Sequence, residues 1–360
     1  MKAAVFHERG GHVAVEDVQV RDPAEGEVRV AIAAAGLCHS DVSAINGTYP
    51  TPVPTVLGHE GAGWVEAVGP GVRTVREGDA VVLSTLAHCG HCPACAVGRP
   101  TLCHAAPVPQ TPFLFRGQPA YTFANASTFA ERTLVRASCA VPIPRGMPMA
   151  QAALIGCGIV TGVGAVLNRA RVDAGQTMAV FGAGGIGLNV IQGGVLAGAA
   201  RIVAVDLMAQ KLDWARRFGA TEILDVATGI DPVQAIRDLT GGRGVDHAFE
   251  AVGSLAAIEQ AFASLAPGGT LTIVGVPRLD ARADFLVNAL RLDRRVQGCR
   301  YGSARPQRDF PMLAELYLSG RLKIDELITR HYALDDVNLA MEDLERGELA
   351  RGVFDVAAGG

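Results

Sequence analysis

The sequence predicts an α/β protein in which a β-rich region precedes a doubly wound parallel sheet. Up to about residue 85, short alternating runs such as VAVEDVQV and GWVEAVGPGV are separated by glycine and proline, as expected of strands joined by turns. From about residue 161 onward, apolar strand-like runs alternate with helical patterns. This alternation is typical of a parallel sheet with helices on its faces.

Length and composition limit the class of protein. The 360 residues suffice for about two domains with separate cores. Hydrophobic residues make up 49% of the chain and charged residues 19%, which is typical of a soluble globular protein. The net charge of −4 provides no basic excess for binding nucleic acid or an anionic membrane, so we expect neither partner.

The first 20 residues, MKAAVFHERGGHVAVEDVQV, lack the apolar core of a signal peptide, and no later apolar run reaches about 18 residues. We therefore expect a cytoplasmic protein. In that compartment the eight cysteines are expected to be metal ligands or packing thiols rather than disulfides. Cys139 and Cys299 have no ligand-type neighbours in the sequence and are expected to be packing thiols.

Two polar motifs interrupt the β-rich region, GLCHSD at residues 36–41 and LGHEG at residues 57–61. Cys38 and His59 in these motifs are possible metal ligands. On their own they are equally consistent with a buried thiol and a hydrogen-bonded histidine.

Four thiols lie within fifteen residues in CGHCPACAVGRPTLC: Cys89, Cys92, Cys95 and Cys103. Four thiolates at this spacing can complete a tetrahedral shell around zinc, which indicates a structural site. A disulfide pair is the main alternative. A nucleic-acid-binding zinc ribbon would need a basic surface, and only Arg99 lies nearby. The flanking histidines are expected at the surface: His88, His91 and His104.

The segment MAVFGAGGIGLNVIQGGVLAGAARIVAVD at residues 178–206 predicts a strand, a glycine turn, a helix over about 186–196 and a second strand. Its GAGGIG turn has the G-x-G-x-x-G spacing that brings the backbone and a helix N-terminus close to the pyrophosphate of a dinucleotide. Asp206 ends the second strand, where a carboxylate can bind the adenosine ribose. The alternative is a strand-end acid that caps the following turn.

The remaining elements follow in order. Residues 104–125, HAAPVPQTPFLFRGQPAYTFAN, show no clear period and are expected to form a loop at the border of a pocket. Strands are predicted in EILDV, VDHAFEAVG, TLTIVGV and RGVFDVA, and helices near residues 209–218, 232–239, 255–265, 310–318 and 334–344.

Over nearly its whole length the chain resembles the medium-chain zinc-dependent alcohol dehydrogenases. The matching segments are GLCHSD, GHEGAGWVEAVGPGVRTVREGDAVV, the four-cysteine lobe, ASTFAERTLV, LIGCGIVTGVGAV and VFGAGGIG. ASTFAE and IGCGIVTG are similar to the branch that contains glutathione-dependent formaldehyde dehydrogenase and the animal alcohol dehydrogenases. The resemblance implies a GroES-like catalytic domain over residues 1–160 with a structural zinc lobe at about 88–104, a Rossmann domain over 161–300, and a return to the catalytic domain over 301–360.

The resemblance also implies a catalytic zinc, in addition to the structural one, with an open fourth position and three ligands: Cys38, His59 and Cys157. Glu60 matches a carboxylate close to the metal, and Asp41 an acid that orients the ligand histidine. Ser40 matches the hydroxyl that takes the alcohol proton while hydride passes to the nicotinamide. The alternative for Ser40 is a turn hydroxyl bonded to local backbone.

The cofactor residues implied are Thr161 at the nicotinamide, His39 and Arg351 at the pyrophosphate, Lys211 at the ribose, and Val274 together with the glycine-turn residues Gly182, Gly184, Gly185, Ile186 and Gly187. The alternative for Arg351 is a solvated arginine at the surface. The carboxylate of Asp206 would repel the 2′-phosphate of NADP, and residues 207–210 contain no arginine to receive it, so we expect NAD.

Departures from the family pattern concern the substrate. Ser43 replaces a relay histidine, so the proton is expected to leave through water or a ribose hydroxyl. The charged residues that bind glutathione in the family are replaced here by Tyr49, Thr51 and Pro107. Thr85 stands where an aromatic residue commonly lines the inner part of the substrate pocket. We therefore expect reversible oxidation of apolar aliphatic, allylic or aromatic primary alcohols to aldehydes, by a homodimer or homotetramer.

Two alternatives remain. One is a dehydrogenase of the same fold that acts on the adduct of formaldehyde or another aldehyde with a thiol other than glutathione. The other is a non-catalytic relative, which should lack one catalytic ligand.

Overall fold

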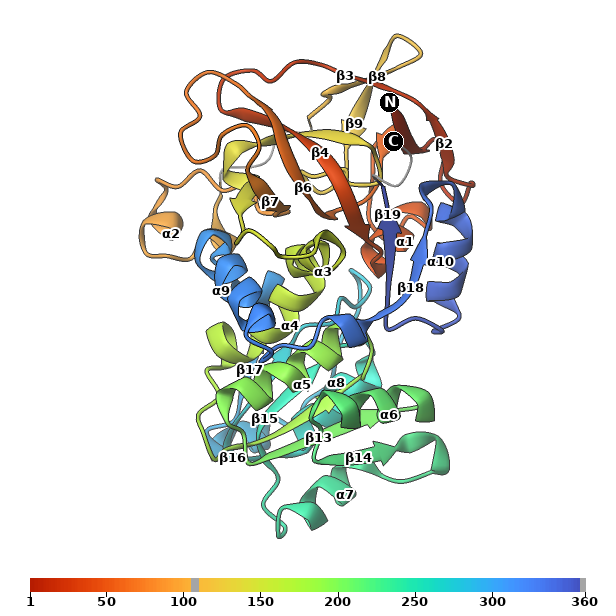
Figure 1. Ribbon diagram of the computed structural model, residues 1–360. Coiled ribbons are helices and arrows are strands. Elements are labelled where there is room, and N and C mark those ends of the chain that lie inside the picture. The colour runs from red at the N-terminus through yellow and green to blue at the C-terminus, as the bar shows by residue number, and fades with distance from the viewer. Residues whose placement is uncertain (105–109, 357–360) are drawn as a thin grey trace. The chain divides into compact units, whose positions relative to one another are not determined.

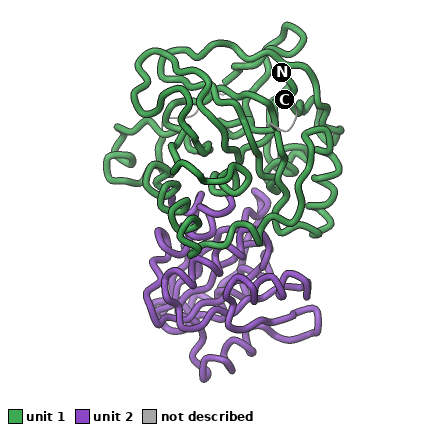
Figure 2. The backbone as a smooth tube through the Cα atoms, in the orientation of Figure 1, with its two compact units in different colours: residues 1–157, 305–360 green, residues 158–304 purple. Residues whose placement is uncertain are grey.

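The computed structural model describes residues 1–104 and 110–356. Pro107 therefore lies outside the described residues. The chain divides into two compact units, one formed by Met1–Cys157 with Arg305–Gly360 and the other by Gly158–Ala304 (Figure 2). The resemblance placed the divisions after residues 160 and 300.

The first unit contains two mixed sheets (Figure 1). One sheet has six strands in the order β2-β1-β5-β9-β8-β3. These are β1 Lys2–Phe6, β2 Ala14–Asp17, β3 Gln19–Val20, β5 Thr55–Val56, β8 Phe113–Phe115 and β9 Gln118–Thr122. The β8–β9 hairpin corrects the expected loop over residues 104–125. Its turn residues Arg116 and Gly117 both have positive φ, as in the tight turns that suit hairpins.

The second sheet has the order β11-β7-β6-β4-β19-β18, with β10 also paired to β4. The strands are β4 Glu27–Gly36, β6 Glu60–Val68, β7 Ala80–Leu83, β10 Arg132–Arg136, β11 Ala140–Pro142, β18 Ile328–Tyr332 and β19 Arg351–Asp355. Strand β19 runs antiparallel to β4, with Val353 opposite Gly36. This register places the last strand next to the start of the GLCHSD motif.

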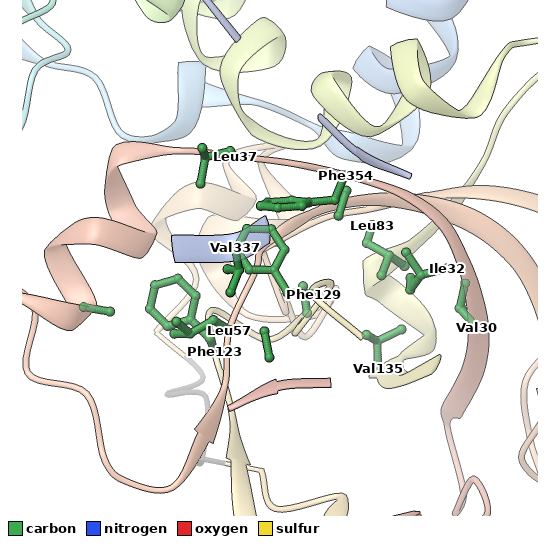
Figure 3. Close-up of a cluster of buried hydrophobic side chains, with 14 of the residues drawn as sticks. Val30, Ile32, Leu37, Leu57, Leu83, Phe123, Phe129, Val135, Val337 and Phe354 are labelled. Atoms are coloured by element: carbon green, nitrogen blue, oxygen red, sulfur yellow. The ribbon is translucent and has the colours of Figure 1, made fainter. Parts of the chain in front are cut away.

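The main hydrophobic cluster of this unit, part of which is drawn in Figure 3, includes residues that neighbour two of the candidate ligands in the sequence. Leu37 and Leu57 are fully buried in it. The rings of Phe129 and Phe354 pack edge to face with their centroids 4.7 Å apart, which is a favourable aromatic geometry. Because Leu37 precedes Cys38 by one residue and Leu57 precedes His59 by two, burial of these leucines limits the movement of both candidate ligands.

Helices of the first unit are α1 His39–Ile45, α2 Pro93–Ala96, α3 Met149–Leu154, α9 Pro306–Leu318 and α10 Val337–Glu345. Helix α1 was not predicted, because seven residues are too few to show a helical period. Helix α9 begins at Pro306, four residues before the expected start, since proline suits the first helical position.

Residues Met149–Ala170 are helical throughout, with α3 and α4 (Val160–Gly164) each followed by a π-helical segment, Ile155–Ile159 and Ala165–Ala170. The segment is long and apolar enough to cross a membrane by length and composition. The sequence expectation that no segment reaches this length is therefore wrong. About 72% of its apolar window is buried within the protein, as in the core helix of a globular domain.

The second unit is a six-stranded parallel sheet in the order β14-β13-β12-β15-β16-β17. Its strands are β12 Thr177–Phe181, β13 Arg201–Asp206, β14 Glu222–Asp225, β15 Val245–Glu250, β16 Leu265–Ile273 and β17 Arg295–Gly298. Besides α4, its α-helices are α5 Gly185–Ala197, α6 Ala209–Phe218, α7 Pro232–Leu239 and α8 Leu255–Ala263. The predicted fold class is confirmed.

Strand order reverses between β12 and β15, and such a switch point opens a crevice at the carboxyl ends of the strands. The glycine turn after β12 lies at that position. The short polar strand β17 was missed by sequence analysis, because RVQG has neither an apolar run nor clear alternation.

Candidate active site and metal centres

Cys38, His59, Glu60 and Cys157 form one cluster, in which a ligand atom from each lies within 4.8 Å of the others. Cys38 is the N-cap of α1, Glu60 begins β6 with His59 just before it, and Cys157 lies in the first π-helical segment. The structure thus brings together the three residues expected to bind the catalytic zinc, along with the neighbouring carboxylate.

Asp41 is fully buried and connects two of these residues. Its Oδ2 accepts a hydrogen bond from the Cys38 backbone N–H at 3.3 Å. Its Oδ1 accepts from the Gly58 N–H at 3.1 Å and lies 3.2 Å from Nδ1 of His59. One carboxylate therefore fixes both the start of α1 and the orientation of the imidazole.

The other imidazole nitrogen, Nε2 of His59, is buried without a hydrogen-bond partner among the described residues. Burial acts to lower the pKa of His59, but Asp41 and Cys38 raise it well above its ordinary value. Phe123 meets the imidazole edge-on, with ring centroids 5.7 Å apart. A buried imidazole nitrogen beside two thiols, unpartnered within the described part of the chain, matches the donor set of a Cys₂His zinc site.

Cys38 and Cys157 act as a pair. A hydrogen bond from Cys157 lowers the pKa of Cys38 well below its ordinary value, and the same contact, together with burial, raises the pKa of Cys157. Zinc binds cysteine as thiolate, so metal binding at this pair would release a proton.

Glu60 is fully buried and forms an ion pair with Arg351, which is 5% exposed. Burial raises the pKa of Glu60 to about 7, against the lowering effect of Arg351. Glu60 Oε1 and Arg351 Nε have no partner among the described side chains. This pairing was not anticipated, because the two residues are 291 positions apart.

The four-cysteine lobe forms a second cluster of possible metal ligands. Sγ of Cys103 lies 3.8 Å from Sγ of Cys92 and 3.7 Å from Sγ of Cys89. A tetrahedral shell with zinc–sulfur bonds of about 2.3 Å has sulfur–sulfur edges of about 3.8 Å, so the thiols fit zinc. Disulfide bonds have sulfur atoms about 2 Å apart, and all four cysteines are free.

Hydrogen bonds from Cys95 lower the pKa of Cys92 to about 6, whereas burial raises the pKa of Cys95 itself to about 12. His91 is exposed and His88 is half-buried, and neither belongs to the ligand cluster.

In the second unit the glycine turn joins β12 to α5, whose N-cap is Gly184. Gly182 has φ of 96°, and a Cβ on Gly187 would lie 1.7 Å from the Gly182 carbonyl oxygen. Both positions therefore require glycine, for the turn and for close helix packing respectively. Helix α5 begins one residue before the expected start.

Asp206 at the end of β13 accepts two backbone hydrogen bonds, from Ala183 N–H to Oδ2 at 2.7 Å and from Met208 N–H to Oδ1 at 3.0 Å. The second hydrogen bond is the turn cap expected as the alternative role of this acid. The first joins the carboxylate to the glycine turn. Each carboxylate oxygen retains a further lone pair, so the cap is compatible with a ribose contact.

The other candidate residues are placed as follows. Ser40 Oγ lies 3.9 Å from Cys38 Sγ, and His39 is exposed on α1. Thr161 and Lys211 are half-buried, and Val274 is buried directly after β16. Cys139 and Cys299 are buried free cysteines, as expected.

Two residues of the second unit were missed. Glu250 is fully buried at the end of β15, and its carboxylate accepts hydrogen bonds from the backbone N–H groups of Val252 and Gly253 at 2.7 and 2.6 Å. These bonds hold Val252, which is 59% exposed, beside the glycine turn, where a Cβ on Gly182 would lie 2.4 Å from it. An acid at a strand end, as at Asp206, was the available signal.

Comparison with known proteins agrees with this arrangement. Residues 24–145 match the alcohol dehydrogenase GroES-like domain, and residues 185–319 match the family of zinc-binding dehydrogenases. The chain therefore belongs to the zinc-dependent alcohol dehydrogenase family, which confirms the resemblance drawn from its motifs.

Its relatives include the NDMA-dependent alcohol dehydrogenase of Amycolatopsis methanolica, 38% identical over 98% of each chain. The probable S-(hydroxymethyl)glutathione dehydrogenase 1 of Schizosaccharomyces pombe is 36% identical over 99% of this chain and 97% of its own. The crystal structure of benzyl alcohol dehydrogenase from Acinetobacter calcoaceticus has a TM-score of 0.93 at 33% identity, covering 99% of each chain.

Proposed function

We propose that this enzyme reversibly oxidises apolar primary alcohols to aldehydes with NAD, using zinc held by Cys38, His59 and Cys157. The observation that supports this most directly is the cluster itself, in which two thiols meet an imidazole nitrogen that has no hydrogen-bond partner among the described residues, beside a buried carboxylate. A closed four-thiol lobe would hold a second, structural zinc. The non-catalytic alternative is disfavoured, because none of the catalytic ligands is missing.

The chain's own groups have distinct roles in the proposed reaction. When bound, zinc supplies a Lewis acid for the alcohol oxygen, and NAD accepts the hydride. Asp41 and Phe123 hold His59 in one orientation, while Arg351 balances the charge of Glu60.

Ser40 would take the alcohol proton. Ser43 follows it by three residues on α1, so both hydroxyls lie on one face of the helix. Because Ser43 stands in place of a relay histidine, we expect the proton to continue to water or a ribose hydroxyl.

The cofactor would bind at the carboxyl ends of the parallel strands, with its pyrophosphate at the glycine turn. Leu207 and Val252, which follow β13 and β15, are 67% and 59% exposed. They offer apolar surfaces for the adenine ring. The carboxylate of Asp206 favours free ribose hydroxyls over a 2′-phosphate.

The cofactor assignment is tested by kcat/KM for NAD and NADP in the wild type and in Asp206→Ser. We expect a wild-type preference for NAD of about tenfold or more, which the substitution reduces. Lys211 carries a positive charge near the ribose position and offsets part of the repulsion, so discrimination is not absolute. A wild-type preference for NADP would remove Asp206 from this role.

The substrate assignment rests on Thr85, Tyr49 and Thr51, which offer neither an aromatic wall nor charges for glutathione. A panel of ethanol, hexanol, cinnamyl and benzyl alcohol, with hydroxymethylglutathione as the competing substrate, tests it. We expect benzyl alcohol to give a higher kcat/KM than ethanol and the glutathione adduct. Faster turnover of the adduct would overturn the assignment, and dependence of aldehyde oxidation on another added thiol would favour the thiol-adduct alternative.

We further propose that the enzyme forms a dimer through the free edge of β17. Among the described strands, β17 pairs with β16 alone. Large apolar side chains are exposed in the segment around it, at Val276, Leu279, Leu286, Val287, Leu290 and Leu292. A second copy that pairs along this edge would satisfy the open backbone groups and cover the apolar side chains.

A further inference from the structure

The turn that follows β9, at residues 123–127, has an unusual backbone. Ala124, Asn125 and Ser127 have φ of 48°, 61° and 52°. Non-glycine residues rarely adopt this left-handed conformation, and here three of them lie within five positions. Such strain persists only where surrounding contacts hold the chain in place.

Side-chain hydrogen bonds hold this turn. Ser127 Oγ accepts from the Phe123 N–H at 2.9 Å and donates to the Val56 carbonyl at 2.7 Å. Asn125 Nδ2 donates to the Thr85 carbonyl at 2.9 Å. The Asn125 bond connects the turn to a segment 40 residues earlier in the chain.

The turn and the residue that follows it contact the ligand cluster. The ring centroids of Phe123 and His59 are 5.7 Å apart, and Thr128 Oγ1 donates a hydrogen bond of 2.9 Å to the Glu60 carbonyl. On the other side, Thr85 follows β7, whose Leu83 carbonyl would lie 2.7 Å from a Cβ on Gly156, next to Cys157. Asn125 therefore joins the segment that contains Phe123 to the segment that follows β7, and both segments contact residues of the cluster or their neighbours.

We propose that Asn125 is a specificity-determining positioning residue, which fixes the separation between Thr85 and Phe123 at the edge of the alcohol site. This inference rests on the proposed alcohol dehydrogenase function. With the hydrogen bond from the Asn125 side chain in place, Thr85 and Phe123 stay at a fixed separation, and a ring or a long chain packs closely between them. Without that hydrogen bond the two residues move independently, and apolar contact with a bulky alcohol weakens more than contact with ethanol.

Two variants separate the hydrogen bond from the backbone strain. Asn125→Asp keeps the size of the side chain and tolerates a left-handed φ, but a carboxylate has no hydrogen to donate to the Thr85 carbonyl. Asn125→Gly removes the bond and also relieves the strain. Arg116→Gly, in the exposed β8–β9 turn at φ of 49°, is the matched control for strain relief without a link to the cluster.

The holoenzyme variants are compared by kcat and KM for benzyl alcohol and ethanol, zinc content, and calorimetric binding of benzamide and acetamide to the cofactor complex. In both Asn125 variants we expect the benzyl-to-ethanol ratio of kcat/KM to fall about tenfold, mainly through KM, because a poorly fitted apolar pocket loses about this factor. Benzamide binding should weaken similarly, acetamide binding should change little, and both zinc ions should remain. Arg116→Gly should match the wild type.

Unchanged selectivity and benzamide binding in both Asn125 variants would overturn the inference while leaving the proposed function intact. An equal loss for all ligands, accompanied by loss of zinc, would also overturn it, since Asn125 would then only support the fold. A zinc-loaded wild type that turns over no alcohol would instead refute the proposed function, and the two amides would still report on the width of the site.

Discussion

Around the ligand cluster, the positions of the reactive side chains depend on three neighbouring glycines. A Cβ on Gly36 would lie 2.4 Å from Glu60 Oε2, and one on Gly156 would lie 2.7 Å from the Leu83 carbonyl oxygen. Gly58 has φ of 85° and closely approaches Phe129. Each glycine lets backbone or side chain approach the cluster where a larger residue would displace it.

Gly156→Ala is expected to push the π-helical segment away from β7 and to displace Cys157. Metal analysis of the purified variant should find about one zinc per chain instead of two, with loss of alcohol turnover. Gly298→Ala, at a position with no neighbour within 4 Å of the added Cβ, is the control and should keep both zinc ions. Two zinc ions and full activity in Gly156→Ala would contradict the geometric argument.

The environment of His247 leads us to expect that the free energy of unfolding depends on pH. Its Nε2 lies 2.9 Å from Gln176 Oε1, its Nδ1 is buried without a partner among the described residues, and burial lowers its pKa. The unfolded chain therefore takes up a proton at higher pH than the folded one. The stability that depends on neutral His247 is present above about pH 6.5 and is lost as pH falls through the lowered folded pKa.

We expect the thermal unfolding midpoint to fall less between pH 7 and pH 5.5 in His247→Gln than in the wild type, because the neutral amide takes up no proton. The substitution of exposed His12 by glutamine controls for a general histidine effect. Equal pH profiles in the wild type and His247→Gln would show that this histidine does not contribute.

At the scale of elements, the four-cysteine lobe has little packing to hold it. Helix α2 has only four residues, and the buried side chains between Cys89 and Cys103 are Cys92, Pro100 and Thr101. So small a core does not offset the entropy of ordering the chain, and we expect a bound metal ion to supply the remaining free energy. The lobe is therefore expected to fold only with zinc.

Cys95→Ser should lower the zinc content to about one per chain, increase hydrogen exchange over residues 89–103, and lower the unfolding midpoint. The other metal site should keep its zinc, because its ligands come from different elements. Cys139→Ala, which changes a buried packing thiol, should retain both metal ions. A Cys95→Ser protein with two zinc ions and an ordered lobe would remove the assignment of this cluster as a structural zinc site.

At the scale of the whole molecule, the proposed dimer interface is the edge of β17 that has no partner strand among the described residues, together with its exposed apolar neighbours. Leu286 and Val287 are 81% and 77% exposed. Charged residues in their place would be desolvated at a self-paired edge.

Light scattering of the double variant Leu286→Glu, Val287→Glu should therefore give the mass of one chain, where the wild type gives twice that mass or, for a tetramer, four times. Leu339→Glu, at an exposed leucine of the first unit, is the control and should not change the mass. A wild type that is monomeric at micromolar concentration would contradict the proposed interface.

Several elements were determined by the sequence alone. The helices over residues 209–218 and 232–239 agree with the structure, because helical period and the start of a helix at Pro232 after its Asp231 cap depend on neighbours within a few positions. The glycine turn and the acid that ends β13 were likewise recognisable from spacing. The spacing of four thiols also indicated one metal-binding cluster, and the family resemblance implied the second, since zinc is commonly bound by cysteine thiolates and histidine imidazole.

Other features were decided only by the tertiary structure. The pairing of Glu60 with Arg351 and the bond from Asn125 to Thr85 join residues far apart in the chain, and no local pattern records them. The short elements α1, β17 and the β8–β9 hairpin hold their conformation through contacts with the rest of the fold. Local signals arise from backbone geometry and periodicity, whereas these contacts depend on how distant segments pack, which is a property of the whole chain.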